Sequence, residues 1–224
     1  MIPLRSTERV YSKSVATATL IAINVLIFLY QVSLPQYVLS GFVEHWGIVP
    51  DAISGHLYTL FTAMFLHGGW LHLLGNMLFL WVFGRNVEDL IGSGRFVVFY
   101  IVVGLISGIV QVMASSYSRI PTIGASGAIA GVMGAFLIKF PRARIVTLIP
   151  IIIFFTTMEI PAALLLILWF AMQLANGFGS LGETDYTGGG VAFFAHIGGF
   201  IAGMLLIRVF PPVVRRWRSW QDAD

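Results

Sequence analysis

Long apolar runs separated by short polar segments dominate the chain. The first run covers residues 15–34 and is long enough to cross the roughly 30 Å hydrocarbon core of a bilayer. Later runs cover residues 57 or 69 to 83, 96–114, 124–139, 159–176 and 191–210. The pattern therefore predicts an all-α, polytopic membrane protein with six transmembrane helices, of which the fourth is too short to cross the membrane.

Two regions between the apolar runs depart from this pattern. Residues 35–56 contain prolines and glycines but no lysine or arginine, and we expect a loop that lies partly in the membrane interface. The apolar stretch 145–176 exceeds one span and is interrupted by Pro150 and Pro161. A carboxylate is favourable at a helix N-terminus, so the fifth span is predicted to begin near Glu159, after an interfacial or re-entrant piece at 145–157.

Composition supports a membrane protein of one domain. The 224 residues are 58% hydrophobic and 10% charged, whereas soluble domains average about 25% charged residues. Cysteine is absent, which excludes a disulfide framework, a cysteine nucleophile and a cysteine-based metal site. The net charge of +3 reflects lysines and arginines at the ends of the apolar runs, so no nucleic-acid partner is expected.

The distribution of basic residues predicts the orientation. With six spans, 12 of the 13 lysines and arginines fall on the side that carries both termini, and Arg119 falls on the other. The positive-inside rule places both termini in the cytoplasm, with the cell membrane as the expected location. This predicts a cytoplasmic N-terminal segment at 1–14, a membrane domain at 15–210 and a basic cytoplasmic tail at 211–224.

Three polar side chains fall at one predicted depth. Ser126 lies 13 residues before Lys139, which is roughly 20 Å of helix. His196 lies 12 residues before Arg208, and His72 lies 12 before Gly84, roughly 18 Å in each case. A single intramembrane histidine would be read as a contact between helices, but two histidines and a serine at matched depth indicate a functional site.

The residue types favour acyl transfer by serine. His72 and Asn76 are four residues apart and share a helix face, which suits two donors to an oxyanion; the alternative is an interhelical hydrogen-bonded pair. No zinc-protease motif and no pair of intramembrane aspartates occurs, and no metal or cofactor is predicted. Because no carboxylate can be placed at this depth, a serine mechanism would use a Ser–His dyad without an acidic third member.

These motifs together resemble those of the rhomboid family of intramembrane serine proteases. The matching segments are His67-Gly-Gly-Trp-Leu-His72-Leu-Leu-Gly-Asn76, Gly124-Ala-Ser126-Gly127 and Ala195-His196-Ile-Gly-Gly199-Phe-Ile-Ala-Gly203. The resemblance covers essentially the whole chain in the basic six-helix form and implies a bundle around a short central fourth helix.

The resemblance also implies roles. Ser126 would be the nucleophile and His196 the general base, while the oxyanion would be held by His72, Asn76 and backbone amides near Ser126, including that of Gly124. Gly199 and Gly203 would let the sixth span approach the fourth closely. Some members carry an aromatic residue where this chain has Ala130, so the orientation of the histidine must come from elsewhere. The segment 41–50 also lacks an arginine that some members carry after the first span.

The leading hypothesis is an endopeptidase that cleaves transmembrane segments of membrane proteins near their outer ends. Alternatives are a non-catalytic rhomboid-like protein that binds or escorts membrane helices, and a small-solute channel or transporter. Substrate access is expected to involve the glycine-rich loop 176–190, with Trp169, Phe170 and Phe178 as gate residues. The alternative is that this loop is a flexible connector.

Overall fold

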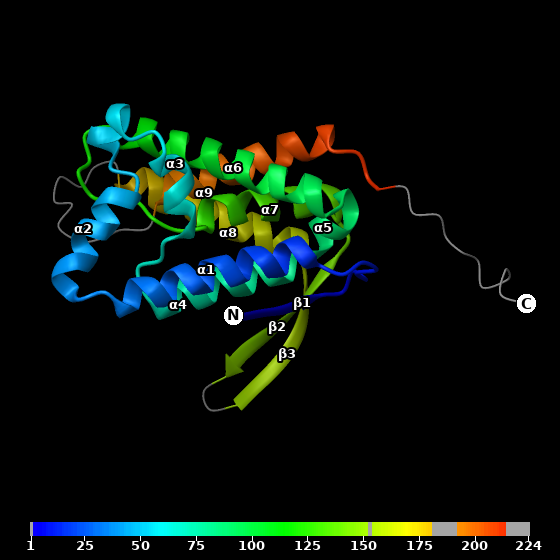
Figure 1. The fold of residues 1–224 in the computed structure, drawn as a ribbon. Coiled ribbons are helices and arrows are strands. Elements are labelled where there is room, and N and C mark those ends of the chain that lie inside the picture. The colour runs from blue at the N-terminus through cyan, green and yellow to red at the C-terminus, as the bar shows by residue number, and fades with distance from the viewer. Residues whose placement is uncertain (1, 152–153, 181–191, 214–224) are drawn as a thin grey trace, which may run out of the picture.

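The computed structural model describes residues 2–151, 154–180 and 192–213 (Figure 1). The chain is mostly helical, as predicted. Among the described residues, three helices are long and apolar enough to cross a membrane, namely α1 (Val15–Ser33), α6 (Ser93–Ala114) and α8 (Ala162–Ser180). Two further apolar helices are shorter, α7 (Ser126–Lys139) and α9 (Phe193–Leu206), and α9 continues into the 3-10 turn η4 (Ile207–Val209).

The second apolar run is a broken span. Helix α3 (Thr59–Thr62) and the turn η2 (Ala63–Phe65) meet α4 (Trp70–Phe79) at a bend of 95°. Helix α4 continues through a π-helical turn η3 (Leu80–Gly84) into α5 (Arg85–Ile91). The helix therefore continues past residue 83, where the apolar run ends, and the two halves count as a fourth candidate span only when taken together.

A side chain from α1 satisfies the backbone at this break. The amide of Gln31 accepts a hydrogen bond from the N–H of His67 at 3.0 Å and donates to the carbonyl of His67 at 3.3 Å. Non-helical backbone at membrane depth must find such partners, because hydrocarbon offers none. The paired contact allows the chain to turn and restart as α4, which carries His72 and Asn76.

Residues 35–56, predicted to be a loop, are largely helical. They form α2 (Gln36–Trp46) and the 3-10 helix η1 (Pro50–Gly55). Leu39, Phe42 and Trp46 recur at helical spacing, a periodicity that outweighs the helix-disfavouring Gly41. Phe42 packs edge-on against Tyr30 of α1 with ring centroids 5.7 Å apart, so α2 lies against the first span.

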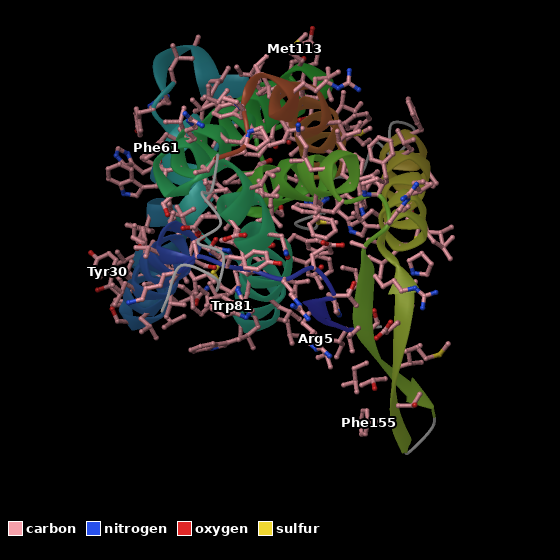
Figure 2. The ribbon with its side chains drawn as sticks, turned by 90° about the vertical axis from the view of Figure 1, so that its right-hand side faces the viewer. Arg5, Tyr30, Phe61, Trp81, Met113 and Phe155 are labelled. Atoms are coloured by element: carbon pink, nitrogen blue, oxygen red, sulfur yellow. The ribbon has the colours of Figure 1, made fainter. Side chains whose placement is uncertain are left out.

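A three-stranded antiparallel sheet, which the all-α prediction omitted, projects from the helices. Strands β2 (Arg144–Ile151) and β3 (Phe154–Pro161) form a hairpin, and β1 (Ile2–Ser6) pairs with β2. Figure 2 shows Phe155 of β3 far from the helices. The segment is rich in β-branched residues, which favour extended backbone. Residues 145–151 and 154–157, predicted as part of an interfacial or re-entrant piece, therefore lie in paired strands. The fifth span was predicted to begin near Glu159, but Glu159 lies in β3 and α8 begins at Ala162.

Helix α7 forms the centre of the bundle. Every residue from Gly127 to Phe136 is buried, and the helix contacts α4, α6, α8 and α9 (Figure 1). Its closest neighbour is α9, because glycines on both helices remove the side chains between them. A Cβ atom built on Gly199 would collide with the carbonyl of Gly127, and one on Gly203 with the carbonyl of Gly131. The contact between α7 and α9 thus lies at Gly199 and Gly203, the two glycines singled out in the sequence.

A buried carboxylate joins three helix ends on the opposite side of the bundle from the α3–α4 break. Glu88 of α5 is 1% exposed and accepts hydrogen bonds from the N–H groups of Ala16 and Thr17, each at 2.8 Å. It also accepts one from the hydroxyl of Ser93 at 2.6 Å. These N–H groups belong to the first turn of α1 and have no intrahelical partner, so a negative charge there satisfies both the hydrogen bonds and the helix dipole.

Adding one methyl group between α7 and α9 tests the glycine contact. We expect Gly203→Ala to lower the free energy of unfolding by about 1–3 kcal/mol, because the new Cβ meets backbone that no rotamer change can move. The matched control is Gly75→Ala on α4, where a Cβ meets nothing within 4 Å. The control should be neutral or stabilising by about 0.5–1 kcal/mol. Thermal unfolding in micelles measures both, and equal melting temperatures would contradict the contact.

Removing the charge of Glu88 tests the junction of the three helices. Glu88→Gln retains one acceptor oxygen but places an amide NH₂ against a backbone N–H, so we expect a loss of about 1.5–3 kcal/mol in stability. Glu159→Gln is the control, because that carboxylate forms an exposed ion pair with Arg144 at 3.7 Å. Its loss should stay within about 0.5 kcal/mol. A Glu88 variant as stable as the control would show that the junction contributes little.

Candidate functional site

The backbone that leads into Ser126 is held at two points. Ile48 and Thr122 form an antiparallel bridge, in which each N–H donates to the other residue's carbonyl at 3.0 and 2.7 Å. Two residues later, the N–H of Gly124 donates to the carbonyl of Ala63 at 2.8 Å. Gly124 has φ of 130°, a conformation that favours glycine, and a Cβ there would also meet the ring of His72 at 2.8 Å.

Ser126 is the first residue of α7, and its hydroxyl contacts a histidine. The distance from Ser126 Oγ to Nε2 of His196 on α9 is 2.7 Å, although the two residues are 70 positions apart in the chain. The structure therefore brings together the serine and the histidine that were singled out by depth. The N–H groups of the first helical turn have no intrahelical partner, so the N-terminus of α7 favours negative charge beside this serine.

The start of α9, and with it His196, is held by α6. The hydroxyl of Ser107 donates to the carbonyl of Ala195 at 2.8 Å, and the N–H of Ala195 donates to the side-chain oxygen of Gln111 at 3.0 Å. Sequence reasoning missed both residues. Ser107 and Gln111 lie four positions apart on one face of an otherwise apolar span, and this pattern could have identified them.

The imidazole of His196 is also contacted from α8, by two residues one helical turn apart. Its Nδ1 lies 2.7 Å from Oε1 of Gln173, and its ring lies 5.7 Å from that of Trp169. Gln173 was not predicted. The group that faces Nδ1 is a neutral amide. Both of these contacts to the imidazole come from α8.

His72 and Asn76 lie on α4 beside the serine. Nδ1 of His72 accepts a hydrogen bond from the N–H of Gly68 at 3.3 Å, which leaves Nε2 as the protonated nitrogen, near Gly124. The side-chain nitrogen of Asn76 is buried and has no hydrogen-bond partner among the described residues. An unpaired buried donor is costly. The N–H of Gly124 already donates to the carbonyl of Ala63, so this amide is not free to bind an oxyanion. Gly124 instead shapes the turn that precedes Ser126.

The expected gate residues lie along the α8–α9 contact. Phe170 stacks on Phe200 with centroids 4.7 Å apart, and Phe178 meets Phe194 edge-on at 6.2 Å while remaining 64% exposed. Residues 176–180, expected to be loop, belong to helix α8. Residues 181–190 of the predicted loop lie outside the described part of the chain.

The features above define a class of protein. Most of the chain consists of apolar helices, several of them long enough to span a bilayer, and a serine and a histidine from two different helices share a hydrogen bond. Within the described ranges, no cluster of three or more histidine, aspartate or glutamate side chains is arranged to hold a metal ion. The class is a polytopic helical membrane protein with a serine–histidine pair inside the bundle.

Comparison with known proteins identifies the family. The Rhomboid domain family matches residues 54–212. The chain is 32% identical to RHOMBOID-like protein 5 of Arabidopsis thaliana over 68% of this chain and 44% of that protein. It is 31% identical to rhomboid protease GlpG of Salmonella choleraesuis over 72% and 51% of the two chains. It is 43% identical to rhomboid protease GluP of Bacillus subtilis over 38% and 16%. The chain belongs to the rhomboid family and spans about half, or less, of the length of these relatives.

Proposed function

We propose that this protein is an intramembrane serine endopeptidase. The observation that carries the proposal is the 2.7 Å contact between Ser126 Oγ and His196 Nε2. With its lone pair facing the hydroxyl, the imidazole accepts the serine proton as Oγ attacks the scissile carbonyl. It then gives that proton to the leaving amine. Water hydrolyses the acyl-enzyme by the same steps, which returns Ser126 to its starting state.

The negative charge that develops on the carbonyl oxygen has candidate donors. The unpaired amide nitrogen of Asn76, Nε2–H of His72 and the N–H of Ser126 at the start of α7 lie on two helices that meet beside the nucleophile. Donors that are fixed before the reaction stabilise this charge without reorganisation. The buried amide of Asn76 supports this assignment most directly, because an oxyanion would give it the acceptor it lacks.

The proposed substrates are transmembrane segments of membrane proteins, cut near their outer ends. Two of the similar proteins are named rhomboid proteases, which supports the activity. We further propose the six-span arrangement across residues 15–210, with α7 and α9 as the fourth and sixth spans. Both termini, at 1–14 and 211–224, would then be cytoplasmic and the protein would lie in the cell membrane. Access would occur past α8, with Trp169, Phe170 and Phe178 at the gate.

Removing either member of the pair should abolish cleavage. In Ser126→Ala and His196→Ala, we expect no detectable cleavage of a single-span substrate in liposomes, together with a retained helical fold. Ser40→Ala and His56→Ala are matched controls, because both side chains are exposed. Full activity in a purified Ser126 or His196 variant would exclude the mechanism.

A fluorophosphonate probe separates the proposal from its alternatives. The probe should label the wild-type protein and not Ser126→Ala, because it reacts only with an activated serine. A helix-binding or helix-escorting protein, or a channel, would retain its function in the Ser126→Ala variant and would not be labelled. Labelling that survives in Ser126→Ala would place the reactive serine elsewhere.

The oxyanion donors should affect turnover more than substrate affinity. We expect His72→Ala and Asn76→Ala each to lower kcat, by on the order of 10²-fold, with KM nearly unchanged, because the donors act on charge present only in the transition state. Steady-state kinetics on the same substrate measure both constants. If the double variant keeps the wild-type kcat, the two residues serve only to join helices.

A further inference from the structure

We propose that Gln173 is the positioning residue that sets the tautomer and orientation of His196. This inference rests on the proposed protease function and adds to it a third residue on α8. Gln173 would act through His196 and would not touch the substrate.

The geometry is that of a buried, directed hydrogen bond. Oε1 of Gln173 lies 2.7 Å from Nδ1 of His196, and the two side chains are each 8% exposed. The other ring nitrogen, Nε2, lies 2.7 Å from Ser126 Oγ. The imidazole is therefore held at both nitrogens, by residues of α7 and α8, while its own backbone belongs to α9.

The identity of the atom that faces Nδ1 decides which proton the histidine carries. A carbonyl oxygen accepts and cannot donate, so Nδ1 must hold the proton and Nε2 must keep its lone pair. Only this tautomer can take a proton from Ser126. The opposite tautomer would place an N–H against the hydroxyl and leave the serine without a base, and loss of the correct tautomer costs about 10⁴-fold in a well-studied triad.

An amide suits this position better than a carboxylate would. Gln173 and His196 are each 8% exposed, and an ionised group buried to this degree must be desolvated at a cost. Glutamine supplies the same acceptor oxygen without a charge. The hydrogen bond it forms is neutral, which is enough to select one tautomer of a neutral imidazole.

Trp169 limits the remaining freedom of the imidazole. It lies four residues before Gln173, on the same face of α8, and its ring packs at 40° to that of His196. Trp169 also contacts Phe200 of α9 with centroids 5.9 Å apart, which fixes its own position. One face of α8 thus provides both a hydrogen bond and a flat surface for the histidine.

Three variants separate positioning from simple packing. Gln173→Met keeps the length of the side chain but removes the acceptor, and we expect kcat to fall by about 10- to 100-fold with KM unchanged. Gln173→Glu keeps an acceptor oxygen and should stay within about threefold of wild type, each protein being assayed at the pH of its own maximum rate. Met172→Leu is the control, because Met172 is next to Gln173 in the chain and is 56% exposed.

The tautomer itself can be read by nitrogen NMR of histidine-labelled protein. The His196 signals, assigned by their loss in His196→Asn, should show protonated Nδ1 and bare Nε2 in wild type and a mixture of tautomers in Gln173→Met. A Gln173→Met variant with the wild-type kcat, or an unchanged tautomer in Gln173→Met, would overturn the inference. If wild type itself neither cleaves nor reacts with the fluorophosphonate, the proposed function has failed instead.

Discussion

The contact on which the rest of this site depends is the direct approach of two helix backbones, α7 and α9. Gly127 follows the serine and Gly199 comes three residues after the histidine, and the carbonyl of one occupies the place of a side chain on the other. The distance between Ser126 and His196 is therefore set by contacts between the two helix backbones. Main-chain contacts of this kind do not relax by rotamer changes, which gives the 2.7 Å contact a rigid base.

Around that contact, buried polar side chains fix the ends and breaks of helices. Gln31 satisfies the backbone where the second span bends, and Glu88 satisfies the first turn of α1. Ser107 and Gln111 do the same for the start of α9. In hydrocarbon each of these backbone groups would otherwise be unpaired. The polar residues inside the bundle thus serve the irregular backbone that the site needs.

The sequence allowed prediction of most helices and of the pairing of Ser126 with His196, because apolar length and depth are local properties. Ser126 and His196 could be matched by counting residues from basic helix ends. Gln173 could not be found this way, since its role depends on how α8 is rotated about its axis, and a helix that is apolar nearly all round does not encode that rotation. The hairpin at 144–161 was missed for a related reason: a run of apolar β-branched residues suits a strand and a membrane segment equally well.

Of the three long apolar helices in the described part of the chain, α8, whose Gln173 contacts His196, is the least buried within the protein. Only 22% of the apolar window of α8 is buried within the protein, against 44% for α6. Ser126 and His196 are fixed to each other by contacts within the protein, whereas α8, which holds Nδ1 of His196, leaves most of its apolar surface uncovered by the protein. In the proposed membrane arrangement, lipid acyl chains would cover this surface of α8, and the bilayer would become part of the scaffold of the proposed site.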